Sequence, residues 1–208
     1  MTVVRLGQRE EKPRTPLLRR RVTPITFLLV ILGLVVFRLW VVETAIVEGK
    51  SMLKTLSSDD RVLVLKLLGL KRFDVVVLTD PQAHETVIKR IVAVPGDTVS
   101  MVPRVRRARG RTIFEGSQLY INGKPYDEPY ATSTLPTVVS PAKLGPGSYY
   151  VLGDNRDDSV DSRAYGPVKR KDVHGVAALV YYPFSRMGLV PRRAVSPGEG
   201  TPATSPSS

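Results

Sequence analysis

Three short stretches of this 208-residue chain carry side chains that could together hydrolyse a peptide bond. They are Gly-Lys-Ser-Met at 49–52, Val-Ile-Lys-Arg-Ile-Val-Ala-Val-Pro-Gly-Asp at 87–97, and Gly-Asp-Asn-Arg-Asp-Asp-Ser-Val-Asp-Ser-Arg at 153–163. A serine hydroxyl attacks a carbonyl once a base removes its proton, and a neutral lysine amine is one such base. The three stretches therefore suggest a protease with a serine nucleophile, a lysine base and a polar loop that orients the lysine.

Ser51 is the candidate nucleophile. Gly49 lies two residues before it, and a glycine there lets the backbone turn sharply and leaves a substrate carbonyl unobstructed. The Ser51 N–H would then donate to an oxyanion. Taken alone, the tetrapeptide also fits an ordinary glycine-serine turn after a strand.

Lys89 is the candidate base. In a β-strand, alternate residues share a face, and those sharing the face of Lys89 are Val87, Ile91 and Ala93. An ammonium among apolar neighbours loses hydration, so its pKa would fall from about 10.4 and the amine could act as a base near neutral pH. The segment alone also fits a lysine on the solvent face of an edge strand.

The third stretch has charges of both signs between an apolar strand at 149–152 and a turn at 165–167. It cannot be an EF-hand, because the sixth-position glycine and the twelfth-position glutamate are missing. Two alternatives stay open: a solvated loop, or a hydrogen-bonded loop whose charges pair internally. The second kind could hold a serine hydroxyl against a lysine amine.

The composition narrows the chemistry further. The chain has no cysteine and two histidines, so thiol nucleophiles and disulfides are impossible and a zinc site would lack ligands. We expect no metal and no cofactor.

An apolar run at 25–42 is interrupted by Arg38 and would form a helix of about 27 Å, just long enough to cross a bilayer. Arg38 can extend to the interface, and Trp40 fits the interfacial aromatic belt. A cleaved secretory signal is disfavoured because a cut after Ala45 would put Glu43 at −3. A core helix of a soluble protein is disfavoured because the run is apolar all round.

Residues 1–24 contain seven basic side chains against Glu10 and Glu11. The positive-inside rule then places the N-terminus in the cytoplasm, and the rest of the chain after the single-pass helix on the extracytoplasmic side of the cell membrane.

Residues 43–190 have the size of one domain, and 191–208 have the composition of a disordered tail. Within the domain, short runs rich in valine and isoleucine predict strands at 61–66, 74–79, 86–94 and 175–182. Asn122-Gly123 predicts a hairpin turn. The predicted fold is mostly β, an antiparallel sheet or barrel-like catalytic domain after one N-terminal transmembrane helix.

The three stretches resemble, in order and nearly residue for residue, the signature boxes of type I signal peptidases. These are membrane-anchored Ser-Lys proteases that remove signal peptides from exported preproteins after small residues at −1 and −3. The similarity spans about residues 41–182.

The resemblance implies that Ser51 is the nucleophile, that Lys89 is the general base and that Ser159 hydrogen-bonds the lysine amine. Ser51 N–H would supply one oxyanion donor, and Gly49 occupies the position that in relatives holds a serine or a glycine, so the second donor stays open. Two supporting ion pairs are implied, Asp161 with Arg163 and Asp154 with Arg90. The residues implied to line the substrate pockets are Val47, Met52, Leu56 and Ile88.

The chain departs from the family at two places of interest. Lys54 replaces a usual proline, so a proline at 54 is expected to preserve activity or raise it. The stretch 103–111 carries five arginines and no acid, and much of the net charge of +12 lies there and in the N-terminal segment. It could be a solvated hairpin, a lipid contact or a nucleic-acid arm.

The sequence thus predicts a monomeric membrane protease whose partners are signal peptides of exported preproteins and membrane lipid, with no nucleic acid. Two rivals are the related soluble Ser-Lys self-cleaving repressors, which carry a DNA-binding domain ahead of the protease fold, and a non-enzymatic surface module with the same fold. The apolar run at 25–42 argues against the first, and a cleavage assay discriminates the second.

Overall fold

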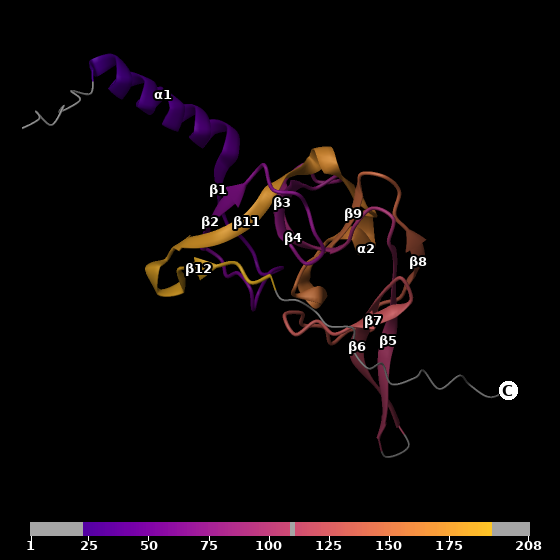
Figure 1. Cartoon of the computed structure of the whole chain (residues 1–208). Helices are drawn as coiled ribbons and strands as arrows, with labels where there is room; N and C mark the ends of the chain where they lie inside the picture. The colour runs from indigo at the N-terminus through magenta and orange to yellow at the C-terminus, as the bar shows by residue number, and fades with distance from the viewer. Residues whose placement is uncertain (1–22, 109–110, 193–208) are drawn as a thin grey trace, which may run out of the picture. The chain divides into compact units, whose positions relative to one another are not determined.

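The computed structural model describes residues 23–108 and 111–192, whose elements are shown in Figure 1. The predicted segments 1–24 and 191–208 therefore lie almost wholly outside the described residues. By its internal contacts the chain divides into two units, Met1–Val36 and Phe37–Ser208. All strands, and all three stretches singled out from the sequence, belong to the second unit.

Helix α1 (Pro24–Val41) forms at the predicted apolar segment. Its large apolar side chains are exposed, among them Phe27, Leu28 and Leu34. By length and hydropathy together, no helix in the described part of the chain qualifies as a membrane span. The helix is confirmed, and its crossing of a membrane stays a prediction.

The larger sheet has eight antiparallel strands. Its order is β1-β2-β11-β3-β4-β9-β10, and β12 pairs with β11. The strands are β1 (Val42–Ile46), β2 (Arg61–Leu65), β3 (Val75–Thr79), β4 (Thr86–Ala93), β9 (Ser148–Leu152), β10 (Val168–Lys169), β11 (Val173–Tyr182) and β12 (Gly188–Leu189). The strands expected from valine- and isoleucine-rich runs are confirmed at β2, β3, β4 and β11.

The smaller sheet has the order β7-β6-β5-β8 and is also antiparallel. Its strands are β5 (Thr98–Ala108), β6 (Arg111–Ile121), β7 (Lys124–Tyr126) and β8 (Val139–Lys143). Asn122 and Gly123 join β6 to β7 with φ values of 55° and 76°, as the predicted hairpin turn requires.

Neither sheet closes on itself in the described part of the chain. The path of the larger sheet ends at β1, which pairs with β2, and at the two-residue strand β10, which pairs with β9. The fold is therefore mostly antiparallel β, as predicted, but the barrel-like closure is wrong because the two end strands do not pair. Short helices fill the connections: α2 (Ser162–Tyr165) and the 3₁₀ helices η1 (Arg156–Asp158), η2 (Arg170–Asp172) and η3 (Phe184–Arg186).

The arginine-rich stretch lies at the end of the β5–β6 hairpin, which extends away from the rest of its sheet (Figure 1). Two of its arginines have acidic partners from elsewhere in the sequence: Arg106 pairs with Glu115, and Arg104 lies 3.6 Å from Asp127. The stretch is thus part of a polar hairpin whose charge is partly neutralised locally.

One buried apolar cluster lies beneath the segment that carries Ser51. It brings Val47, Met52 and Leu56 together with Ile88 of β4, and with valines of β2, β3 and β11. Burying each such side chain stabilises the fold by about 1.5–3 kcal/mol. The cluster therefore fixes an otherwise irregular segment to the larger sheet.

Candidate active site

The segment between β1 and β2 presents Ser51 on a tight turn. The amide of Leu56 donates to the Met52 carbonyl at 2.8 Å, while Met52 and Leu56 are almost completely buried. Gly49 has a φ of +86°, in the left-handed region that favours glycine. A glycine is thus needed two residues before Ser51, as the sequence indicated.

Lys54 lies in the same turn with a φ of 80°. Proline is fixed near a φ of about −65° and cannot adopt this conformation. A proline at 54 would force the backbone of this turn to rearrange, which argues against the expectation that it preserves or raises activity.

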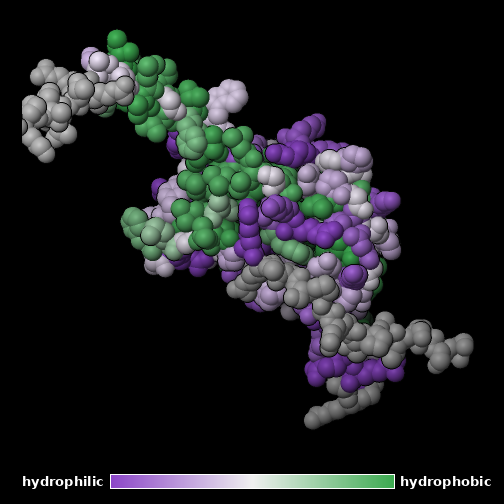
Figure 2. Space-filling model, viewed as in Figure 1, coloured by the Kyte–Doolittle hydropathy of each residue, from purple (hydrophilic) through white to green (hydrophobic). Residues whose placement is uncertain are grey.

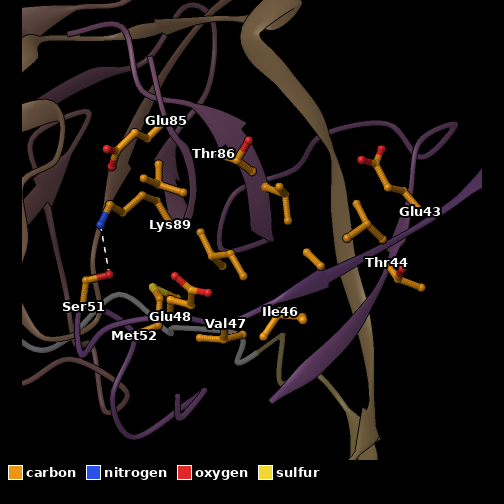
Figure 3. Close-up of a pocket in the computed structure, with 15 residues that line it drawn as sticks. Glu43, Thr44, Ile46, Val47, Glu48, Ser51, Met52, Glu85, Thr86 and Lys89 are labelled. Atoms are coloured by element: carbon orange, nitrogen blue, oxygen red, sulfur yellow. Dashed lines mark hydrogen bonds between the residues drawn. The ribbon is translucent and has the colours of Figure 1, made fainter. Parts of the chain in front are cut away.

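Ser51 and Lys89 are brought together although they are far apart in the sequence. Lys89 Nζ lies 3.0 Å from Ser51 Oγ, a hydrogen-bond distance (Figure 3). β4 supplies Lys89, and its pairing with Val76 of β3 holds it in place. Only 4% of the lysine is exposed, so the solvent-face alternative is excluded.

The pKa of Lys89 is lowered, chiefly because burial removes water from the ammonium form. The carboxylates of Asp161 and Asp80 act in the opposite direction, and Arg163 reinforces the lowering. Asp161 is itself neutralised by Arg163, with Nε 2.7 Å from Oδ1. The net effect shifts Lys89 toward the neutral amine, which is the form that can accept the Ser51 proton.

The loop at 153–163 is internally hydrogen-bonded. This confirms the hydrogen-bonded alternative, in which charges of the loop pair with one another, over a solvated loop. Asp161 accepts from the amide of Gly153 at 3.0 Å and caps α2 by accepting from the amide of Arg163. Arg163 also donates to the carbonyls of Arg156 and Ser159. The predicted ion pair of Asp161 with Arg163 thus fixes the path of the whole loop.

Ser159 lies beside the site, but its hydroxyl has no hydrogen-bond partner among the described residues. The predicted bond to Lys89 is therefore not formed in this structure. Ser159 Oγ instead lies against the backbone of Gly153, where a Cβ would be 2.2 Å from it and 2.8 Å from the Ser51 carbonyl oxygen. Only a glycine at 153 allows Ser159 and the Ser51 carbonyl to lie this close to the backbone at 153.

A second buried ion pair joins β4 to the start of this loop. Arg90 and Asp154 form the predicted pair through two hydrogen bonds, at 2.9 Å and 2.7 Å, and both side chains are 1% exposed. The Thr55 hydroxyl donates to Asp154, and the guanidinium of Arg90 lies 4.1 Å from the centre of the Tyr130 ring. The pair therefore links the base strand to the turn that carries the nucleophile.

Asn155 completes this link. Its backbone N–H donates to the Ser51 carbonyl at 2.9 Å, and its side-chain amide donates to the Lys50 carbonyl at 3.2 Å. Sequence reasoning missed Asn155, Thr55 and Tyr130. Asn155 lies inside the stretch 153–163 and Thr55 lies three residues after the stretch 49–52, so their polar side chains close to catalytic candidates were the available signal.

A cavity of about 450 Å³ opens beside the Ser51–Lys89 pair. Its walls come from β1, from the segment that follows it, and from the first half of β4. Of the predicted pocket residues, Val47, Met52 and Ile88 line it, whereas Leu56 is buried beneath and does not. Within the described residues no cluster of acidic or histidine side chains is arranged to hold a metal ion.

The site can therefore supply a nucleophile, a buried amine with a lowered pKa and a backbone donor next to a cavity bounded by two strands. From Thr86 to Lys89, β4 pairs with β3 along one edge, and its pairing with β9 begins only at Arg90. Both β1 and this part of β4 thus present a strand edge without a partner in the described sheet, and an extended peptide can pair with such an edge.

The chain was compared with known proteins. The family model described as signal peptidase, peptidase S26, matches residues 19–182. "Signal peptidase I S" of Bacillus subtilis is 36% identical over 174 residues, which cover 76% of this chain and 86% of that protein. "Signal peptidase I" of Bacillus caldolyticus is 34% identical over 170 residues, with coverage of 73% and 86%.

A crystal structure of a signal peptidase I from Enterococcus faecalis is also similar. It is 31% identical, with a TM-score of 0.39, and the match covers 52% of this chain and 97% of the other.

Proposed function

The chain belongs to the signal peptidase family, peptidase S26, and from this membership we propose that Ser51 and Lys89 are its catalytic pair. The family assignment makes it a serine endopeptidase that removes signal peptides. The observation that carries the choice of residues is the 3.0 Å contact between the Ser51 hydroxyl and the buried amine of Lys89.

In the proposed reaction, Ser51 Oγ attacks the carbonyl carbon of the residue at −1 while Lys89 accepts the hydroxyl proton. The Ser51 N–H donates to the developing oxyanion, and Gly49 leaves room for the substrate carbonyl beside it. The lysine then gives its proton to the leaving amine. A water molecule activated by the same neutral amine hydrolyses the acyl-enzyme, which releases the signal peptide and restores Ser51.

Ser159 has the role of orienting the lysine in this proposal. Its buried hydroxyl has no partner in the described part of the chain, and an unsatisfied buried hydroxyl costs about 1–3 kcal/mol. A hydrogen bond to the Lys89 amine would remove this cost. The carbonyl of Ser159 accepts from Arg163, which holds the backbone that carries this hydroxyl.

The substrate-binding part of the proposal uses the cavity. Val47, Met52 and Ile88 form its apolar floor near Ser51, where small side chains at −1 and −3 would be accommodated. An extended chain alternates its side chains, so positions −1 and −3 face the same wall.

Membrane attachment is also part of the proposal. The apolar side chains of α1 are exposed. The second unit, Phe37–Ser208, which we call the catalytic unit, has its own apolar surface at Ile46, Tyr182, Phe184, Met187 and Leu189. Figure 2 shows hydrophobic surface over α1 and, within the catalytic unit, around β12. We place the N-terminus in the cytoplasm and the catalytic domain outside, with lipid as a partner of these apolar surfaces.

The test is cleavage of a preprotein by the full-length chain in detergent, with the cut located by mass spectrometry. Wild type should cleave once, after a small residue, and both Ser51→Ala and Lys89→Ala should lose the activity. Ser140→Ala and Lys124→Ala are matched controls, because both side chains are exposed and lie outside the cavity. Unchanged cleavage by either active-site variant contradicts the proposal.

A further inference from the structure

The cavity beside Ser51 carries an excess of negative charge. Its lining includes three glutamates, Glu43, Glu48 and Glu85, and a single cationic side chain, Lys89. Burial favours the neutral form of Lys89. The lining is therefore anionic, although the whole chain has a formal net charge of +12.

Two of these carboxylates are free to meet a substrate. Glu43 lies 3.2 Å from Lys66, whereas Glu48 and Glu85 are exposed and have no side-chain partner among the described residues. Lys50 and Lys54 are close to Ser51 in the sequence but do not line the cavity. Nothing cationic in the lining therefore offsets Glu48 and Glu85 once Lys89 is neutral.

The two free carboxylates come from opposite walls. Figure 3 shows Glu48 on the wall of Ser51 and Met52, and Glu85 on the wall of Lys89. Glu85 is four residues before Lys89, which corresponds to about 13 Å along an extended strand. An extended substrate with its scissile carbonyl at Ser51 thus meets one carboxylate close to the cleaved bond and the other about four residues away.

A cleft lined by one sign of charge concentrates the field and favours ligands of opposite sign. We propose that Glu48 and Glu85 are specificity-determining residues that select preproteins with a lysine or arginine within about four residues of the cleaved bond. This inference rests on the proposed function, because the substrate must place its carbonyl at Ser51.

The experiment uses the full-length chain in detergent and peptides derived from one uncharged parent substrate. Each peptide carries lysine, glutamine or glutamate at one position on either side of the small residues. The chain is tested as wild type, Glu48→Gln, Glu85→Gln and the double variant. Asp127→Asn is the control, because it removes the same charge from an exposed residue outside this cavity.

At one or more positions, wild type should prefer lysine over glutamate by about tenfold in kcat/KM, with glutamine between, since an exposed carboxylate contributes up to about fivefold. The preference should fall in the matching glutamine variant, vanish in the double variant and weaken at high salt. Asp127→Asn should keep it in full.

Two results overturn the inference and leave the proposed function standing. One is equal cleavage of the lysine, glutamine and glutamate peptides at every position. The other is a lysine preference that survives in the double variant. Failure of wild type to cleave even the uncharged parent would instead overturn the proposed function, and this inference with it.

Discussion

Gly153 has no side chain, and this allows two segments of the candidate site to lie close together. Its Cα lies where the loop of Ser159 and the turn of Ser51 approach each other, and a Cβ would come within 2.2 Å of the first and 2.8 Å of the second. Real Cβ atoms do not approach so closely, so one of the two segments must move. The nearer atom belongs to a side chain, but the other is the carbonyl oxygen of the nucleophile itself.

Gly153→Ala should therefore lower kcat/KM by about 100-fold, because a displacement of about 1 Å at a catalytic group has this effect. The measurement is peptide cleavage by detergent-solubilised protein, with circular dichroism to confirm the fold. Gly145→Ala is the matched control, since a Cβ at that position would have nothing within 4 Å and the φ of Gly145 is ordinary. Full activity of Gly153→Ala would show that the two segments need not be so close.

At this scale the sequence predicts well that Ser51 and Lys89 meet, and it predicts the surroundings of this pair poorly. Ser51, Lys89 and the two ion pairs could be predicted because each lies in a recognisable motif. The missing bond of Ser159 and the left-handed conformation of Lys54 could not, because both depend on where distant backbone segments meet.

At the scale of elements, the Arg90–Asp154 pair holds β4, the turn of Ser51 and the loop after β9 in one arrangement. The pair is fully buried, and Thr55 and Tyr130 contact it from two further segments. Breaking a buried pair leaves an uncompensated charge, which is far more costly than losing a pair at the surface.

Asp154→Ala should lower the free energy of unfolding by about 3–5 kcal/mol, measured by urea denaturation followed by circular dichroism. Asp127→Ala removes the exposed partner of Arg104 and should cost less than about 1 kcal/mol. Similar losses for both variants would mean that the buried pair is not what joins these elements.

The elements themselves differ in how well the sequence predicts them. β2, β3, β4 and β11 were predictable because runs of valine and isoleucine are typical of buried strands. The outer half of the β5–β6 hairpin was not, because its arginines give no alternation of apolar and polar residues. The order of strands in the sheet depends on pairings between distant segments and cannot be derived from local patterns.

At the scale of the whole molecule, the chain divides by its contacts within α1, between Val36 and Phe37, and apolar side chains are exposed on both sides of this division. Exposed apolar surface of this extent is typical of proteins that contact a membrane. A protease attached in this way would meet its substrates at the bilayer, which suits the removal of signal peptides.

The full-length chain should stay in the membrane fraction after carbonate extraction, and Leu28→Lys combined with Leu32→Lys should release it. A lysine at the centre of a membrane helix costs about 2.5–3.5 kcal/mol. Leu135→Lys is the control, since it places the same charge on an exposed leucine of the catalytic unit. Release of wild type by carbonate would contradict attachment through α1.

The most direct test of the central claim, that a neutral Lys89 activates Ser51, is the pH dependence of kcat/KM on an uncharged peptide. Burial lowers the pKa of Lys89, and the deprotonated amine is the active form. Activity should therefore rise with pH, with a midpoint below 10.5, the ordinary value for lysine. A midpoint at or above 10.5, or a rate independent of pH, would contradict the account.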